Sequence, residues 1–404
     1  MRITPIKIEN QSQAQKLMTL LGVTRQGADI LSPKSVYAVF KIEGIRSWEA
    51  NIIKQHLLSL GSDSAIERNA LIKNINTATI IFGSISQLNK LCVKLKNQPF
   101  NLKEIADELS LCLTNMFKTE FIFKARNKTL EIKKPVICGI INLTTDSFSG
   151  DGLLKYQVSN TNYQKLVLKR VEEMIKDGAG MIDLGAESTR PYSKPISEKE
   201  EVKRIAQALR TIRKEFKNVM FSVDTYKFNV AKVAVEEGAD IINDITALRK
   251  APAIINLLKK HKLGVILMHM KGNPSTMQKN PYYENVTEDI LDFFKKRILL
   301  LGKEKIEQTR VLFDPGIGFG KTAKDNLKII KELYKIKTLG YPVFLGLSRK
   351  AFIGKIIEGP PDARLYGTIA ANVVAYMSGA NILRVHDVKE NSQALNIAFN
   401  IINN

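Results

Sequence analysis

The chain contains few residues of the kinds that build disulfide frameworks or metal clusters. Among its 404 residues there are three cysteines and four histidines. The cysteines, Cys92, Cys112 and Cys138, are scattered, and no two of them form a C-x-x-C pair. This spacing excludes a disulfide scaffold and a structural zinc site, and it is typical of a reducing compartment. We therefore expect a cytoplasmic protein.

Long apolar segments are also missing. No stretch approaches the roughly 18 uninterrupted apolar residues that a membrane-spanning helix needs. The first residues, MRITPIKIENQSQ, lack the apolar core of a signal peptide. We expect no membrane partner for this chain.

Acidic residues are fewer than basic ones. The chain has 61 Lys and Arg against 40 Asp and Glu, which gives a net charge of +21. This excess is compatible with nucleic acid, an anionic membrane surface or an anionic small molecule as partner. The positive charges are interleaved with acidic residues and form no concentrated stripe with aromatic platforms. We therefore expect no nucleic-acid partner.

A glycine loop for binding nucleotides is absent as well. The nearest candidate is DPGIGFGKT at residues 314–322, where Lys321 takes the place of the third glycine of G-x-G-x-x-G. Pro315 takes the place of the first glycine of a G-x-x-x-x-G-K-[ST] loop. An open, doubly wound sheet that binds a nucleotide is therefore disfavoured.

The C-terminal two thirds of the chain shows a regular alternation instead. Short apolar runs bounded by Gly, Asp or Pro alternate with longer amphipathic stretches, which is the pattern of successive βα units. The predicted strands are 135–143, 180–184, 219–223, 240–245, 264–268, 310–313, 342–347 and 381–385. Eight such units over about 270 residues predict the α/β class and a (β/α)8 TIM barrel, which needs about 250 residues.

Residues 1–118 do not continue this alternation. They are predicted to form a smaller N-terminal α+β domain of unknown function, with strands at 36–42 and 78–82 and helices at 47–60, 86–95 and 102–116. The segment 121–132 is predicted to be a hairpin that covers the floor of the barrel. The barrel domain then spans residues 119–404.

Polar and charged residues follow nearly every predicted strand. In a TIM barrel the strand ends and the βα loops form the active site, so we expect these side chains to converge on one mouth. Arg190, Arg384 and His386 are donors suited to phosphate oxygens. Asn142 and Asp146 offer hard oxygen ligands, which suit a Mg²⁺ that bridges phosphates.

Other residues at the strand ends suit a flat heterocycle. Asp224, Asn243 and Asp314 are mainly hydrogen-bond acceptors, and Lys350 can donate to a ring carbonyl or nitrogen. No Ser-His-Asp order and no zinc-ligand spacing is present, and His269 is predicted to be structural. The residues alone thus predict a phosphorylated heterocyclic substrate with Mg²⁺ as cofactor.

Eight segments, one at each predicted strand, resemble the signatures of the dihydropteroate synthase family. They are IINLTTDSFS at 140–149, DLGAESTRP at 183–191, SVDTYK at 222–227, INDI at 242–245, MHMKG at 268–272, DPGIGFGK at 314–321, GLSRK at 346–350 and RVHD at 384–387. The resemblance extends from about residue 121 to the C-terminus, with the motifs in order.

This resemblance implies a transferase of folate synthesis. Members of the family condense (7,8-dihydropterin-6-yl)methyl diphosphate with 4-aminobenzoate, which gives 7,8-dihydropteroate and diphosphate. The family is the target of the sulfonamides and is commonly dimeric, so a homodimer is implied here. It also implies an SN1-like loss of diphosphate assisted by Mg²⁺.

The resemblance implies roles for individual residues as well. Asp224, Lys350 and Arg190 are expected to be catalytic, and Asn142 and Asp146 to hold the metal. Around the pterin, contacts are expected from Asp224, Asn243, Asp314, Lys350, Ile245 and Met268. The diphosphate is expected to contact Arg384 and His386, and both the diphosphate and the aminobenzoate are expected to contact Thr189, Arg190 and Pro191. Phe148, Phe319 and Lys350 are expected to lie beside the aminobenzoate.

Several positions depart from the usual family pattern, among them the order of the residues at 149–152. Thr145 replaces a proline, Ala186 replaces a glycine, and Tyr192 replaces the glycine after Arg190-Pro191. None of these changes removes a charged contact, so we expect activity to survive. Two alternatives remain open: a pterin-binding barrel of the methyltransferase kind, and a paralogue that binds pterin without catalysis.

Overall fold

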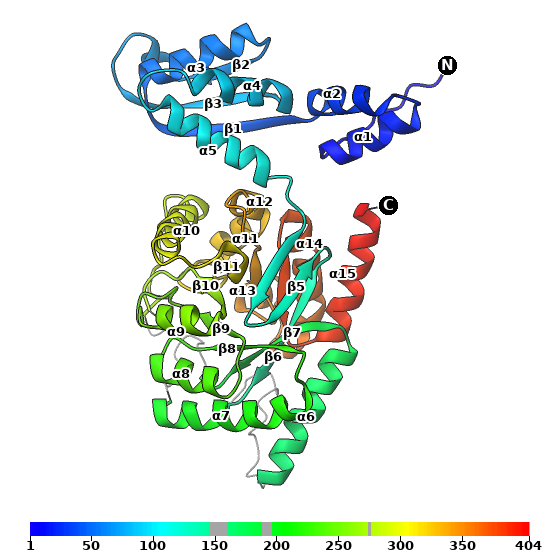
Figure 1. Cartoon of the computed structure of the whole chain (residues 1–404), viewed down its shortest axis with the longest axis vertical. Helices are drawn as coiled ribbons and strands as arrows, with labels where there is room; N and C mark the ends of the chain where they lie inside the picture. The colour runs from blue at the N-terminus through cyan, green and yellow to red at the C-terminus, as the bar shows by residue number, and fades with distance from the viewer. Residues whose placement is uncertain (145–159, 188–195, 274–275, 404) are drawn as a thin grey trace. The chain divides into compact units, whose positions relative to one another are not determined.

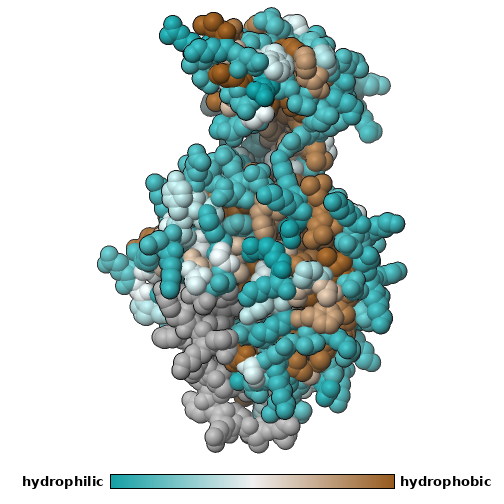
Figure 2. Space-filling model, turned by 90° about the vertical axis from the view of Figure 1, so that its left-hand side faces the viewer, coloured by the Kyte–Doolittle hydropathy of each residue, from teal (hydrophilic) through white to brown (hydrophobic). Residues whose placement is uncertain are grey.

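The computed structural model describes residues 1–144, 160–187, 196–273 and 276–403. The chain divides into two compact units, Met1–Phe117 and Lys118–Asn404 (Figure 1). In the described residues no helix is long and apolar enough to cross a membrane. Hydrophilic residues cover most of the face drawn in Figure 2, and apolar residues gather there only in limited patches.

The N-terminal unit is an α+β unit built on a three-stranded antiparallel sheet in the order β1-β3-β2. Its elements are α1 (Gln11–Leu20), α2 (Arg25–Ser35), β1 (Tyr37–Arg46), α3 (Ser47–Ser59), β2 (Asp63–Ile66), η1 (Arg68–Leu71), β3 (Asn76–Ser84), α4 (Ile85–Leu95) and α5 (Leu102–Asn115). Ile53 and Leu57 of α3 pack with Ile81 of β3 and with Leu88 and Leu91 of α4 in its core. The sequence missed α1, α2 and β2, because the two helices bury only three small residues between them and β2 has four residues.

The C-terminal unit is the predicted barrel, and eight parallel strands form it in the order β11-β10-β9-β8-β7-β6-β13-β12. The strands are β6 (Val136–Asn142), β7 (Ala179–Gly185), β8 (Met220–Asp224), β9 (Ile241–Asp244), β10 (Gly264–Met268), β11 (Val311–Asp314), β12 (Phe344–Gly346) and β13 (Ile382–Val385). A parallel bridge between Phe313 and Val343 joins the two ends of this sheet. The (β/α)8 prediction is therefore confirmed.

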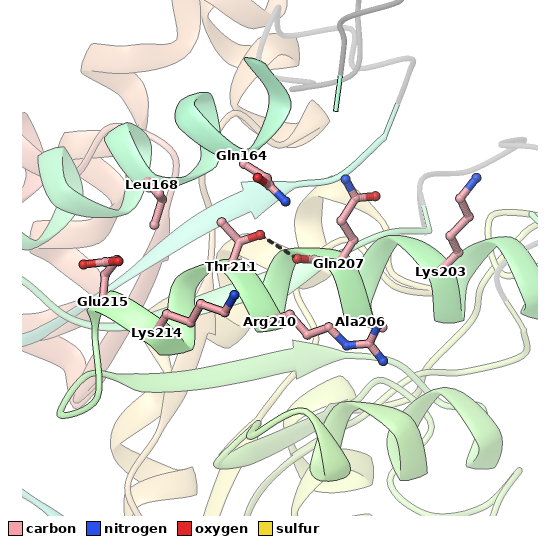
Figure 3. A pocket seen from close by; sticks show the side chains of 9 residues that line it. All are labelled: Gln164, Leu168, Lys203, Ala206, Gln207, Arg210, Thr211, Lys214 and Glu215. Carbon is pink, nitrogen blue, oxygen red and sulfur yellow. Dashed lines mark hydrogen bonds between the residues drawn. The ribbon is translucent and has the colours of Figure 1, made fainter. Parts of the chain in front are cut away.

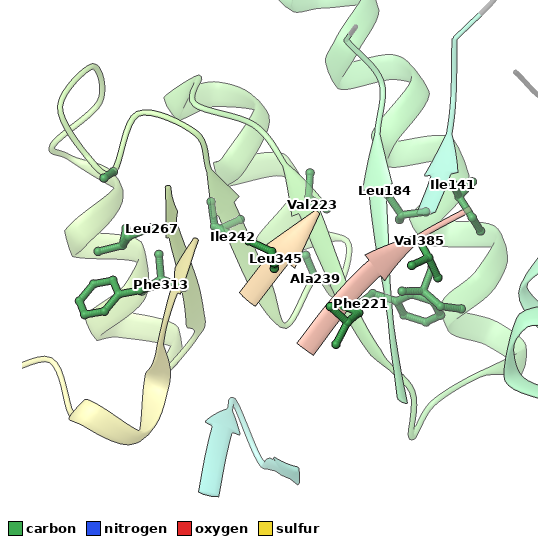
Figure 4. Close-up of a cluster of buried hydrophobic side chains, with 14 of the residues drawn as sticks. Ile141, Leu184, Phe221, Val223, Ala239, Ile242, Leu267, Phe313, Leu345 and Val385 are labelled. Atoms are coloured by element: carbon green, nitrogen blue, oxygen red, sulfur yellow. The ribbon is translucent and has the colours of Figure 1, made fainter. Parts of the chain in front are cut away.

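Helices surround the barrel. They are α6 (Asn160–Lys176), α7 (Glu198–Glu215), α8 (Phe228–Glu236), α9 (Ile254–His261), α10 (Val286–Lys303), η2 (Gln308–Arg310), α11 (Ala323–Lys331), α12 (Leu333–Lys337), α13 (Ala351–Ile357), η3 (Pro361–Arg364), α14 (Leu365–Ser378) and α15 (Val388–Asn403). Outward side chains such as Ile141, Leu184, Ile242 and Val385 pack against these helices (Figure 4). Because both faces of each strand are buried, the strands are continuous apolar runs.

One end of the barrel is closed by the hairpin of β4 (Phe121–Ala125) and β5 (Lys128–Ile132), as the sequence predicts. Phe121 and Phe123 pack among the inward side chains at the beginnings of the strands. Gly264 leaves room for this plug, since a Cβ there would lie 2.6 Å from Cζ of Phe123. The hairpin thereby fills the end of the barrel at which the strands begin.

We expect Phe123→Ala to lower the free energy of unfolding by about 3–5 kcal/mol, because Phe123 is fully buried and loss of its ring would leave a cavity in the hairpin plug. Ile122→Ala is the matched control, since the neighbouring Ile122 is 52% exposed and its truncation should cost less than about 0.5 kcal/mol. Urea unfolding of both variants measures the difference. Equal costs would contradict a plug that fills the barrel.

Candidate active site

The interior of the barrel changes from apolar to polar along the strands. Met181, Met220, Ile241, Leu312 and Ile382 face inward above the hairpin. Side chains alternate along a strand, so the residues two positions later also face inward. These residues are Asp183, Ser222, Asn243, Asp314 and Arg384, and Asp224 follows Ser222 on the same face. The strand ends therefore bring together residues that lie far apart in the sequence.

Arg384 is the cation at the centre of this polar layer. Its Nε donates to Oδ2 of Asp183 at 2.7 Å, and its Nη2 donates to Oδ2 of Asp224 at 3.4 Å. Nδ2 of Asn243 donates to the same oxygen of Asp183 at 3.2 Å. Burial disfavours the charge on Arg384, but the carboxylates of Asp183 and Asp224 outweigh it and raise the pKa of the guanidinium.

Asp224 has an unusual protonation equilibrium. Burial raises its pKa to about 7, and the neighbouring carboxylate of Asp183 adds to the rise, while Arg384 opposes it. Near neutral pH this carboxyl can therefore be ionised or protonated at small cost. Such a group can accept a hydrogen bond from a ring N–H and can also respond to positive charge that develops nearby.

Lys350, Asp314 and Phe319 form one side of the site. Nζ of Lys350 lies 5.0 Å from the centroid of the Phe319 ring and donates to the carbonyl of Ile317. Burial lowers the pKa of Lys350 to about 8, against the effect of Asp314. Burial raises the pKa of Asp314, whose Oδ1 accepts from the backbone N–H of Gly316 at 2.7 Å. Lys350 thus offers a donor beside an aromatic face.

His386 and Asn142 lie together at the ends of β13 and β6. Nε2 of His386 is 3.4 Å from Nδ2 of Asn142, and Nδ1 of His386 is 2.8 Å from Oγ of Ser348. The amide of Asn142 can only donate through Nδ2, which makes Nε2 of His386 the acceptor. Ser348 therefore fixes the ring of His386, a role that the sequence, which places Ser348 only among the polar residues at the strand ends, did not indicate.

An apolar wall completes the described part of the site. Ile245, Met268, Met270 and Met277 form one buried cluster, and Tyr226 and Phe319 pack against it. Methionine side chains are flexible and polarisable, which suits contact with a flat aromatic ring. The predicted contacts Ile245, Met268 and Phe319 are thus brought together with the polar layer.

Two glycines let the loop after β11 approach the loop after β10. Gly316 has φ of +69°, and a Cβ there would lie 2.0 Å from the carbonyl oxygen of His269. Gly320 has φ of +65°, and a Cβ there would lie 2.4 Å from the carbonyl oxygen of Lys271. The DPGIGFGK segment therefore needs its glycines for close backbone packing and for left-handed turns.

Lys321 is buried at the same junction. Its Nζ lies 3.0 Å from Nδ1 of His269 and donates to the carbonyls of His269 at 3.2 Å and Phe319 at 3.1 Å. Burial lowers the pKa of Lys321 to about 7 and lowers that of His269 as well. The structural role predicted for His269 agrees with these contacts. In the sequence Lys321 is a mismatch to nucleotide motifs and the last residue of the DPGIGFGK segment, and neither observation predicts these contacts.

Five predicted site residues lie outside the described residues. Asp146 and Phe148 belong to residues 145–159, and Thr189, Arg190 and Pro191 belong to residues 188–195. The other predicted site residues lie at the strand ends described above. A surface groove of about 560 Å³ lies elsewhere, between α6 and α7, and is lined by side chains such as Gln164, Gln207 and Arg210 (Figure 3). These residues are on the outer helices and belong to none of the strand ends.

The residues present are compatible with a bound Mg²⁺. Among the described residues no group of three His, Cys, Asp or Glu side chains could hold a metal ion. A Mg²⁺ that keeps several of its waters requires only one or two protein oxygens besides phosphate oxygens. Asn142 directs its amide nitrogen to His386, and its amide oxygen is a hard ligand of the kind that Mg²⁺ prefers.

Comparison with known proteins agrees with this site. Residues 138–386 match the family model described as pterin binding enzyme. The dihydropteroate synthase of Haemophilus influenzae is 41% identical over 273 residues, which are 68% of this chain and 96% of that protein. The chain belongs to the dihydropteroate synthase family. The predicted family, fold and enzyme class are thereby confirmed, as is the function in folate synthesis.

Solved structures of the dihydropteroate synthase family match the barrel. The enzyme of Yersinia pestis with a sulfonamide drug complex is 37% identical, covers 70% of this chain and 99% of its own, and has a TM-score of 0.64. The enzyme of Xanthomonas albilineans with 4-aminobenzoic acid is 32% identical, covers 71% and 100%, and has a TM-score of 0.63. The ligands of these two structures are small molecules, which agrees with the predicted class of substrate.

One relative in the family also matches the N-terminal unit. The bifunctional dihydropteroate synthase/dihydropteroate reductase of Helicobacter pylori is 31% identical over 395 residues, which are 97% of this chain and 97% of that protein. The N-terminal unit, which contains no motif that we could assign, therefore occurs together with the barrel in at least one other protein.

Proposed function

We propose that the barrel condenses (7,8-dihydropterin-6-yl)methyl diphosphate with 4-aminobenzoate to give 7,8-dihydropteroate and diphosphate. The observation that carries this proposal is the single layer of Arg384, Asp224, Asn243, Asp314 and Lys350 at the strand ends. Its acceptors match the N–H groups of a pterin, and its cations match a diphosphate.

The pterin end of the substrate is assigned to the interior of the barrel. Asp224, Asn243 and Asp314 accept from the ring and its amino group, and Lys350 donates to a ring carbonyl or nitrogen. Ile245 and Met268 lie against the ring. Burial strengthens these hydrogen bonds, because little water competes for the partners.

The diphosphate end is assigned to the rim. Arg384 donates to its oxygens, and His386 can donate from Nε2 in the tautomer whose Nδ1 accepts from Oγ of Ser348. Thr189, Arg190 and Pro191, which lie outside the described residues, are expected to contact the diphosphate as well. Asn142 and Asp146 are the residues that would hold Mg²⁺, which when bound offsets the negative charge of the leaving diphosphate. Arg384 keeps its charge at all physiological pH values, because two carboxylates stabilise it.

The reaction exchanges one bond at the pterin methylene carbon. The C–O bond to diphosphate breaks first and leaves a cationic methylene, which the ring and the nearby carboxylate of Asp224 stabilise. The amine nitrogen of 4-aminobenzoate then forms the C–N bond and loses one proton. Phe148, Phe319 and Lys350 border this second substrate. Because the cation is a strong electrophile, the amine needs no strong general base.

We expect Lys350→Ala to lower kcat/KM for dihydropterin methyl diphosphate by about tenfold to a hundredfold, because a charge-assisted hydrogen bond to the ring is lost. Lys355→Ala on the exposed side of α13 is the matched control and should stay within about twofold of the unchanged chain. Labelled 4-aminobenzoate, Mg²⁺ and the purified full chain give the assay.

Two outcomes would contradict the proposal. The first is no labelled dihydropteroate from the unchanged chain under conditions in which a relative of the family is active. The second is an equal effect of the two lysine substitutions, which would remove Lys350 from the site.

We also propose that the chain forms a homodimer through α14 and α15. These neighbouring helices carry large exposed apolar side chains: Tyr366, Val374 and Met377 on α14, and Ile397 and Ile401 on α15. Apolar residues gathered on adjacent helices are typical of a protein interface.

Sedimentation equilibrium tests the dimer. Met377→Lys combined with Ile397→Lys should give a monomer, because two charges would be buried unpaired in the interface. Leu299→Lys on α10, which is also exposed, is the control and should leave the mass unchanged. A monomeric unchanged chain at micromolar concentration, or a dimer that survives the double substitution, would contradict this interface.

A second candidate function comes from the N-terminal unit. The Helicobacter pylori relative that matches 97% of the chain is named a synthase and a dihydropteroate reductase, whereas the Haemophilus influenzae relative covers 68% of the chain and is named a synthase alone. We infer that the full chain also reduces dihydropteroate. The reaction would add two electrons and two protons across the remaining C=N bond of the dihydropterin ring.

Incubation of the full chain with dihydropteroate and a reduced nicotinamide or a reduced flavin tests this second activity. The expected product is two mass units heavier than dihydropteroate, and its formation should require both protein and reductant. Absence of this product with either class of reductant, in a preparation whose synthase activity is normal, would contradict the second function.

A further inference from the structure

Asp183 is a charged side chain at the centre of the site that no step above uses. It lies on β7, it is fully buried, and it faces the interior of the barrel. Its Oδ2 accepts from both Arg384 and Asn243, at 2.7 and 3.2 Å. Its Oδ1 is buried and has no hydrogen-bond partner among the described residues. A carboxylate buried in this way is costly unless its charge is matched.

We propose that Asp183 is a positioning residue that orients Arg384 and Asn243 for substrate and keeps Arg384 from neutralising Asp224. This inference rests on the synthase function proposed above. Asp183 is assigned no contact with substrate, so its effect passes through the two neighbours that it holds.

The orienting role of Asp183 follows from the atoms of Arg384 and Asn243 that its carboxylate binds. Asp183 binds Nε of Arg384, so Nη2 is the group that reaches Asp224. Asp183 also binds Nδ2 of Asn243. With its nitrogen fixed, Asn243 must present its carbonyl oxygen as the acceptor for a ring N–H. One buried carboxylate thus sets the direction of a donor and of an acceptor.

The second part follows from the competition of two carboxylates for one cation. Arg384 lies 2.7 Å from Asp183 but 3.4 Å from Asp224, so its ion pair with Asp183 is the closer one. The charged groups that act on Asp224 are Arg384, which lowers its pKa, and Asp183, Glu201 and Asp244, which raise it. Removing the charge of Asp183 would remove a repulsion and free Arg384 to approach Asp224.

The two effects predict opposite changes in pH dependence for two substitutions. In Asp183→Asn the acidic limb of the profile of kcat/KM against pH should move to lower pH, because Asp224 then ionises more easily. In Arg384→Gln the same limb should move to higher pH, because the cation that favours ionised Asp224 is gone. A residue that only supports the fold would not move the limb.

A double-mutant cycle on the full chain tests whether Asp183 acts through Arg384. We expect Asp183→Asn to raise KM for dihydropterin methyl diphosphate by about tenfold or more, while KM for 4-aminobenzoate stays within about twofold. Asp183→Asn added to Arg384→Gln should cost less than about twofold further, because residues in one hydrogen-bond network are not additive. Asp240→Asn is the matched control: Asp240 is also a buried carboxylate, but it pairs with Arg213 and with Lys128 of the hairpin, at the opposite end of the barrel, and the activity of this variant should be unchanged.

Three results would each overturn the positioning role: losses of activity that multiply when Asp183→Asn and Arg384→Gln are combined, an acidic limb that does not move, or a loss in Asp240→Asn as large as that in Asp183→Asn. Calorimetry of the binding of inorganic diphosphate in the presence of Mg²⁺ gives a readout that needs no turnover. Asp183→Asn should weaken this binding by a factor similar to its effect on KM for dihydropterin methyl diphosphate. Equal diphosphate affinities would contradict the role of Asp183. An unchanged chain that makes no dihydropteroate would instead refute the proposed function.

Discussion

Burial of opposite charges inside the barrel is the constraint on which the rest of this structure depends. Arg384, Asp183 and Asp224 come from three strands, and none of them could be buried without the others, since an unpaired buried charge costs several kcal/mol. Each side chain therefore has to point into the barrel, where Arg384 reaches both carboxylates. The register of β7 and β8, and that of β13 and β6, is what makes this possible.

The hairpin and the loops after β10 and β11 support this charged layer. The hairpin β4–β5 fills the opposite end of the barrel with phenylalanine, so the charges rest on a packed apolar floor. Gly316 and Gly320 let the loop after β11 lie against the loop after β10, and the buried Lys321 joins the two. A low-dielectric floor strengthens hydrogen bonds at the mouth, but it also raises the cost of any polar group that is left unpaired.

The barrel and most residues of the polar layer could be predicted from the sequence, and the reason is geometric. Strands buried on both faces are continuous apolar runs, and the first polar residue after each run marks the mouth, so Asp224, Asn243, Asp314 and Arg384 could be recognised individually. Asp183, Ser348 and Lys321 stand in the same sequence segments, but the residues that they bind could not be recognised. Asp183 lies inside a strand, Ser348 acts only through the His386 ring, and Lys321 is bonded to backbone carbonyls, so each depends on distances that no linear pattern contains. The N-terminal unit was predicted less completely, because α1 and α2 have small buried faces.

The central claim is that this charged layer holds the pterin and its diphosphate. A crystal structure of the full chain with a non-reactive analogue of dihydropterin methyl diphosphate and Mg²⁺ tests it most directly. We predict ring nitrogens at about 3 Å from Asp224, Asn243 and Asp314, with diphosphate oxygens on Arg384 and His386. A ligand bound in the groove between α6 and α7, or at the strand ends with its diphosphate away from Arg384, would contradict the account.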